Sequence, residues 1–142
     1  MVRFSFAQLG EWAEKQARIA DAVVKQSTND VIVQASKTAT GVTRGGSLQR
    51  GYVPRDTGIL AASLVSTLHG STAITQGDGE FALVVGGMAA GDVATFTWTA
   101  PYARRMHYGD DTRQGWHWVT EATNDWQSIV AGNVAKAKAI VR

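Results

Sequence analysis

Apolar residues recur every three or four positions along the first part of the chain. Ser5 and Gln8 have the spacing of a capping box, in which two side chains satisfy free amides at the start of a helix. The apolar positions that follow are Phe6, Leu9, Trp12, Ala13, Ile19, Ala20, Val23 and Val24, with charged and amide residues between them. This period predicts an amphipathic helix that begins near residue 5.

A β-branched run, Val31 to Val33, follows this pattern and permits two interpretations. It could form a strand after a break at Thr28 and Asn29, or it could continue the helix to about Thr38. We favour continuation, which predicts a helix over about 5–38. The apolar side of a helix of about thirty residues is longer than one small chain can cover. We therefore expect part of this apolar side to contact another chain.

Between residues 64 and 99 the pattern changes to alternation, which predicts strands. The expected strands are 64–68, 72–76, 80–85 and 92–99, with Gly77-Asp78-Gly79 as a hairpin turn before the third. Phe96 and Trp98 share one face of the last strand, which we expect to point inward. These segments predict an antiparallel sheet of three to four strands.

Two short helices and one longer helix complete the expected elements. A helix over 57–63 would follow Pro54, with Asp56 and Thr57 as caps, and a second over 101–108 would begin at Pro101 and close at Gly109. A C-terminal helix over 118–140 has apolar residues at helical spacing: Val119, Ala122, Trp126, Ile129, Val130 and Val134. The chain is therefore expected to be a single α+β domain, 1–142, with its small sheet packed with the N-terminal and C-terminal helices.

The composition excludes several classes of site and partner. The chain has no cysteine, which rules out disulfides, thiolate metal ligands and a thiol nucleophile. A formal charge of +2 is far below that of a dedicated nucleic-acid binder. We expect no membrane span and a cytosolic chain at synthesis, because no apolar run approaches about 18 residues and the N-terminus does not resemble a signal peptide.

Residues 41–55 form a glycine-rich stretch with three arginines, Arg44, Arg50 and Arg55, and no acidic residue. Arginine forks and glycine amides suit phosphate groups, but the Gly-Lys-Ser/Thr ending of a nucleotide-binding loop is missing. The segment is either a solvated surface loop or a loop that faces a DNA channel or a neighbouring subunit.

No pattern of catalytic residues stands out. His69, His107 and His117 match no metal-binding or nucleophile motif, so we expect no enzyme, no metal and no cofactor. Tyr108-Gly-Asp-Asp matches a polymerase motif, but the chain is too short for the palm domain that motif belongs to. The five tryptophans would serve either base or sugar stacking or packing, and we favour packing.

Three short motifs resemble the small neck and tail-completion proteins of long-tailed bacteriophages. They are Pro54-x-Asp56-Thr57-Gly58-x-Leu60 with Ser63, then Tyr102-Ala103, then Tyr108-Gly109. The family usually has a glutamate before the last aromatic-glycine pair, where this chain has His107, so no role for that carboxylate carries over.

The resemblance implies a protein whose role is architectural. Its copies would form a ring, sixfold or twelvefold, in the neck of the virion, after assembly in the host cytoplasm. Its neighbours would be head-completion and tail-tube or tail-terminator proteins, with non-specific contact to packaged DNA.

Within this family the final helix packs beside the first one against the sheet. Asp56, Thr57 and Gly58 would set the turn, and Tyr102 and Tyr108 would anchor the short helix. The alternative is a small basic DNA- or RNA-binding domain, which predicts salt-sensitive binding by the monomer.

Overall fold

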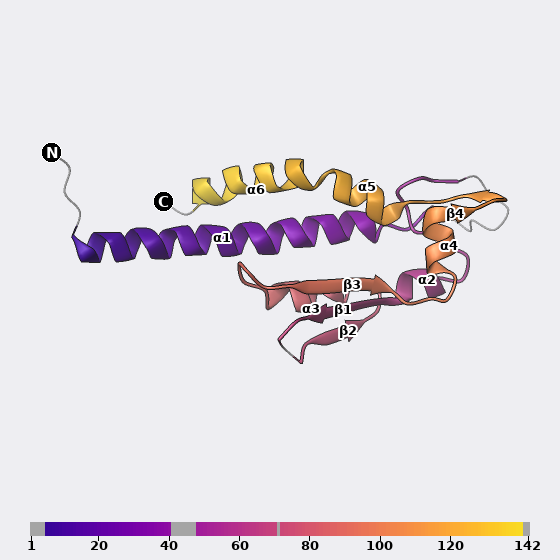
Figure 1. The fold of residues 1–142 in the computed structure, drawn as a ribbon, viewed down its shortest axis with the longest axis horizontal. Coiled ribbons are helices and arrows are strands. Elements are labelled where there is room, and N and C mark those ends of the chain that lie inside the picture. Colours follow the sequence, from indigo (N-terminus) through magenta and orange to yellow (C-terminus); the bar gives the residue numbers. More distant parts are fainter. Residues whose placement is uncertain (1–4, 41–47, 71, 141–142) are drawn as a thin grey trace.

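Residues 5–40, 48–70 and 72–140 are described in a computed structural model, and they form an α+β structure (Figure 1). In chain order the elements are α1 (Phe6–Ala35), α2 (Ile59–Ala62), β1 (Leu64–Leu68), β2 (Ile74–Gln76), α3 (Phe81–Gly86), β3 (Ala94–Trp98), α4 (Ala103–Tyr108), β4 (Gly109–Asp110), β5 (Arg113–Gln114), α5 (Trp118–Asn124) and α6 (Trp126–Ile140). The predicted fold class, with a long first helix, a C-terminal helix and a small antiparallel sheet, is confirmed.

Helix α1 begins with the predicted capping box. The Ser5 N–H donates to Gln8 Oε1 at 2.7 Å, and the Gln8 N–H donates to Ser5 Oγ at 3.1 Å. The helix continues through the β-branched run, because Val31, Ile32 and Ala35 fall at helical spacing and are all buried in the core. The strand alternative for this run was wrong.

The helix ends three residues earlier than predicted, at Ala35. Thr38 instead forms a parallel bridge with Val53, where the Val53 N–H donates to Lys37 O at 2.7 Å and the Ala39 N–H donates to Val53 O at 2.9 Å. These bonds attach the segment before α2 to the end of α1.

The main sheet has three antiparallel strands in the order β2-β1-β3. Leu64 is opposite Trp98 and Leu68 is opposite Ala94. The core-facing residues of β1 therefore lie beside those of β3 on the same face of the sheet. Alternate residues of β1, namely Leu64, Ser66 and Leu68, are buried on that face. Phe96 and Trp98 are half-buried on the same side, which agrees with the expected inward face.

The prediction of a strand over 80–85 was wrong, because this segment is helix α3. Phe81, Val84, Val85 and Met88 are spaced for one helical face and are buried, whereas Leu83 is 69% exposed. A strand would have placed Leu83 on the same face as Phe81 and Val85. Gly77 to Gly79 therefore form a turn into a helix, and not a hairpin between strands.

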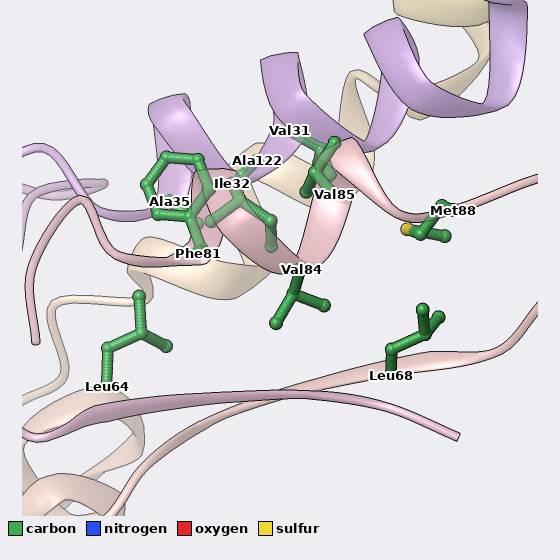
Figure 2. Close-up of a cluster of buried hydrophobic side chains, with 10 residues drawn as sticks. All are labelled: Val31, Ile32, Ala35, Leu64, Leu68, Phe81, Val84, Val85, Met88 and Ala122. Atoms are coloured by element: carbon green, nitrogen blue, oxygen red, sulfur yellow. The ribbon is translucent and has the colours of Figure 1, made fainter. Parts of the chain in front are cut away.

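Helix α3 packs against the inner face of the sheet on one side and against α1 on the other (Figures 1 and 2). The main core draws on four elements: Val31, Ile32 and Ala35 of α1, Leu64 and Leu68 of β1, Phe81, Val84 and Val85 of α3, and Ala122 of α5, together with Met88. Helix α6 packs along α1. Helix α3 lies between the helix pair and the strands (Figure 2), whereas the last helix was expected directly against the sheet.

The single helix predicted over 118–140 is two helices, α5 and α6, which meet at Asp125. The Asp125 N–H donates to Ala122 O at 3.2 Å, which tightens the last turn of α5. Its carboxylate accepts from Gln34 Nε2 at 2.9 Å. Aspartate favours such helix-end positions over helix interiors, because its side chain competes for backbone partners.

A buried polar contact links α6 to α1. Asn133 Nδ2 donates to Ser27 Oγ at 3.1 Å and to Asp30 Oδ2 at 3.0 Å, and both Asn133 and Ser27 are buried. Because each partner has a specific position along its helix, the contact favours one register of the pair.

We expect Asn133→Ala to lower the free energy of unfolding by about 1–3 kcal/mol, because it leaves the buried Ser27 hydroxyl without its donor. Urea unfolding measures the loss. The double variant Ser27→Ala/Asn133→Leu removes both polar groups and should be more stable than Asn133→Ala. An Asn133→Ala midpoint equal to that of the wild type would show that the contact contributes no stability.

Candidate functional site

Motif residues from separate stretches of the chain meet at one end of the molecule. A pocket of about 780 Å³ lies there, and we call it the end pocket. Its walls include Pro54, Asp56, Thr57, Gly58 and Leu60 of the first motif and Tyr102 of the second, and they are completed by Leu48, Ile59, Arg105, Met106, Arg113, Gln114 and Trp116. Helices α2 and α4 and strand β4 lie at this end, opposite the N-terminus of α1 (Figure 1).

The turn before α2 differs from the predicted capped helix. Gly58, with φ +84°, occupies the N-cap position in place of Asp56 or Thr57. No side chain forms a capping hydrogen bond at the start of this helix. The helix is a single turn, Ile59–Ala62, shorter than the predicted 57–63.

Leu60 and Ser63 hold this turn in the core, where both are buried. Ser63 Oγ donates to Leu60 O at 2.7 Å, while Ser63 O accepts from the N–H of Thr99 at 3.0 Å and from its hydroxyl at 2.8 Å. The motif serine thus ties α2 to the strand that leads toward α4.

Helix α4 begins at Ala103, after a turn at Pro101 and Tyr102, and ends at Gly109 as predicted. Its buried residues are Ala103 and His107, whereas Tyr102 and Tyr108 are exposed, so the two tyrosines do not hold α4 to the core. Tyr102 lines the end pocket instead.

Strands β4 and β5 form a tight hairpin directly after α4. Asp110 Oδ1 accepts from the N–H of Thr112 at 2.9 Å, from the Thr112 hydroxyl at 2.8 Å and from the N–H of Arg113 at 3.0 Å. The bonds from Thr112, then that from Arg113 and the charge of Arg105, lower the pKa of Asp110. This aspartate of the Gly-Asp-Asp string therefore shapes a turn.

The basic stretch 41–55 is only partly described, and Arg44 lies outside the described residues. Arg50 Nε donates to Glu121 Oε1 at 2.6 Å, and the Gly51 N–H donates to Trp116 O at 2.7 Å. Arg55 is exposed, but Val53 is fully buried. Val53 is therefore packed in the fold, and Arg50 forms a partly exposed salt bridge with Glu121 of α5.

Two arginines that the sequence did not single out lie at the end pocket. Arg105 comes from α4 and Arg113 from β5, and both are exposed. Neither guanidinium forms a salt bridge with a carboxylate in the described part of the chain. The pocket thus combines an apolar wall with cationic groups at its edge.

Comparison with protein-family models, with curated proteins and with solved structures found no match to this chain. Among the described residues, no helix is long and apolar enough to cross a membrane. The same residues contain no group of three histidine, aspartate or glutamate side chains placed to hold a metal ion. The function of the end pocket must therefore be argued from its own geometry.

His107 of α4 has a defined contact with helix α5. Its Nε2 accepts from the N–H of Val119, in the first turn of α5, at 3.2 Å, so His107 caps that helix from α4. Its ring lies against Tyr108, Trp118 and His117, with centroids 4.4, 4.8 and 5.4 Å away. Burial, and then the neighbouring His117, lower the pKa of His107.

The lowered pKa predicts acid sensitivity. The folded chain keeps His107 neutral while the unfolded chain protonates near its ordinary pKa of 6.5, so stability is complete above that pH and falls as the pH drops below it. We expect His107→Gln, whose amide oxygen can still accept, to lose less stability than the wild type between about pH 7 and 5. Exposed His69→Gln is the control, and an unchanged pH profile in His107→Gln would contradict the role of His107.

The tryptophans near the loops serve packing, as we favoured. Trp116 and Trp118 are buried, and Trp98 meets Trp118 edge to face with centroids 6.0 Å apart. Trp126 and Trp12 are different, at 43% and 63% exposed. Trp126 therefore does not lie on the covered side of its helix, where its spacing with Ala122 and Ile129 had predicted it.

Proposed function

We propose that this chain is a structural protein of a tailed-phage virion, which forms a ring in the neck or upper tail and joins the head to the tail. One observation carries the proposal: residues of the first motif and Tyr102 of the second, which lie far apart in the sequence, come together around the end pocket. Pro54, Gly58 and Leu60 form one wall and Tyr102 another, and Gly109 begins the hairpin that carries Arg113. This convergence supports a shared role for the first motif and Tyr102, whereas Tyr108 and Gly109 do not line the pocket.

The first helix provides a second, independent support. Leu9 is 48% exposed and Trp12 is 63% exposed, and they lie three residues apart on one face of α1. Apolar side chains grouped on an exposed surface are typical of protein interaction sites. A chain that acts as a ring subunit would cover this face with another protein.

The partners follow from this role. The chain would assemble with itself as a ring, sixfold or twelvefold, between head-completion proteins and tail-tube or tail-terminator proteins, with non-specific contact to packaged DNA. It would act without catalysis, cofactor or membrane, first in the host cytoplasm and then in the virion.

Deletion of the coding gene from its parent phage genome tests the proposal. We expect DNA-filled heads and separate tails in the lysate, and joined particles again when the wild-type gene is supplied. An epitope tag located by electron microscopy should mark the head-tail junction. Infectious particles of normal shape that lack the protein would contradict the proposal.

The nucleic-acid alternative is tested with the purified chain. A neck protein is expected to bind DNA or RNA weakly before assembly, because a net charge of +2 supplies few phosphate contacts. A nucleic-acid-binding domain would bind tightly as a monomer and lose about a thousandfold or more in affinity between about 50 and 200 mM salt. That second result would replace the neck proposal.

A further inference from the structure

We propose that strand β3 of one copy pairs with β3 of a second copy, antiparallel and around a two-fold axis at Phe96, so that their main sheets become one continuous sheet. We call the side of β3 that faces away from β1 the free edge. The inference goes beyond the proposed ring and does not rest on it, because the contact joins two chains whether or not they enter a virion. An assembly of sixfold or twelvefold mass contains a whole number of such pairs.

The backbone of β3 is paired on one side only, because β3 is the last strand in the order β2-β1-β3 (Figure 1). The Thr99 N–H donates to Ser63 O at 3.0 Å, and the His69 N–H donates to Val93 O at 2.9 Å. With the register of the two strands, these bonds assign the odd-numbered residues of β3 to β1. Backbone groups alternate in direction along a strand, so the even-numbered residues direct their N–H and C=O groups to the free edge. These residues are Ala94, Phe96 and Trp98.

The free edge lacks the usual protections against pairing. Its backbone groups have no hydrogen-bond partner among the described residues, and of the described elements only β1 and α3 pack closely on β3. The opposite edge strand, β2, is only Ile74–Gln76, and shortness is one common protection. Strand β3 is longer, and residues 93–99 contain no charged residue, proline or glycine. The free edge therefore suits another extended strand.

The sequence at the free edge is symmetrical about Phe96. Thr95 and Thr97 flank it, and the next residues outward are Ala94 and Trp98. A two-fold antiparallel pair centred on Phe96 uses the whole of β3. It exchanges backbone hydrogen bonds between the two Phe96 residues and between Ala94 and Trp98, and these are the residues whose backbone groups point outward.

This register also places compatible side chains beside one another. On the exposed face each Thr95 would lie beside Thr97 of the second copy, and on the core-facing side the two Phe96 rings would meet. Thr–Thr and aromatic pairs on neighbouring strands stabilise a sheet. Ala94 is the smallest residue of the strand and would lie beside Trp98, the largest, so the two tryptophans would not compete for one space. Phe96 and Trp98 are half-buried, and the second copy would cover their remaining exposed surface.

The occupant of the free edge is a second copy, because the strand matches its own reversed sequence in the one register that uses its full length. An interface around a two-fold axis uses the same surface on both chains and is complete with two copies. The pair would therefore cover both free edges and prevent further growth from them.

Disulfide formation tests the register, because the chain has no cysteine of its own. The chains are Thr95→Cys and Thr97→Cys. In the proposed pair, positions 95 and 97 of different copies lie about 4.5 Å apart between Cα atoms, which permits a disulfide. Two copies of one variant would hold their cysteines about 8 Å apart, beyond the limit of about 7 Å. In a glutathione redox buffer, we expect a mixture of the two variants to form at least about tenfold more crosslinked dimer than either alone.

Two controls separate this contact from random collision. A mixture of Ile74→Cys and Gln76→Cys has the same spacing on exposed residues of β2, and it should stay uncrosslinked. Ala94→Pro, added to both β3 cysteine variants, should abolish the crosslink, because proline removes an outward N–H and keeps the bonds to β1. Circular dichroism checks that the variants fold, and the cysteine mixture without the proline decides the register on its own.

Three results would each overturn the pair. They are a mixture that crosslinks no more than its separate variants, equal crosslinking at β2, and a crosslink that survives Ala94→Pro in a folded chain. Register-specific crosslinking of a chain that is absent from phage particles would keep the pair and remove the neck role.

Discussion

Gly109→Ala is expected to lower the free energy of unfolding by about 3 kcal/mol. Gly109 has φ +80° and ψ −179°, a region that essentially only glycine occupies. A Cβ at this position would also lie 2.6 Å from Arg113 O and 2.6 Å from Gly115 N, and these are backbone atoms that cannot move without opening the hairpin. The strain and the overlap act together, so the hairpin would separate from the end of α4.

Gly70→Ala is the matched control for this change. Gly70 also has φ +80°, but a Cβ there would meet nothing within 4 Å. It should lose only about 1 kcal/mol, the cost of left-handed backbone for a residue with a Cβ. Urea unfolding followed by tryptophan fluorescence compares the two. Equal losses would show that the close approach at Gly109 is not what requires a glycine.

Trp118→Ala is expected to lose about 3–5 kcal/mol, the usual result of truncating a large buried aromatic residue. Trp118 is 2% exposed, and its ring contacts Trp98 at 6.0 Å and His107 at 4.8 Å between centroids. Its loss would leave a cavity between β3, α4 and α5. The end pocket should change shape as well, because Arg105 and Met106 of α4 form part of its wall.

Trp126→Ala removes the same side chain from a position that is 43% exposed, and about 1 kcal/mol is expected. Thermal melting and near-ultraviolet circular dichroism report both variants. If Trp118→Ala were no less stable than Trp126→Ala, the cluster around Trp118 would not be part of the stabilising core.

The long first helix and the three strands of the main sheet could be predicted from the apolar patterns of their sequences. Ser5 with Gln8 marks the start of α1, and the apolar stripe repeats over many turns. The apolar run at Phe81 to Val85 could not be assigned in this way. Five apolar residues fit a buried strand or one face of a short helix, and only the position of α1 above the sheet selects the helix.

The candidate site was predictable in part. The turn residues Pro54 and Gly58 carry strong backbone preferences, so a turn there follows from the sequence. Arg113 was missed, because its place at the pocket depends on a hairpin with two-residue strands that leaves no periodic pattern. Arg105 was missed, because the sequence of the short helix α4 does not show which of its sides faces the pocket. The pairing of Arg50 with Glu121 joins residues that are far apart in the chain, and nothing local indicates it.

The most direct test of an assembling subunit is the mass of the wild-type chain in solution, measured by native mass spectrometry over a range of concentrations. We predict a closed oligomer, a sixfold or twelvefold multiple of the chain mass, with few species of intermediate size. A single monomeric species at every concentration at which the protein stays soluble would contradict the claim that the chain is a ring subunit.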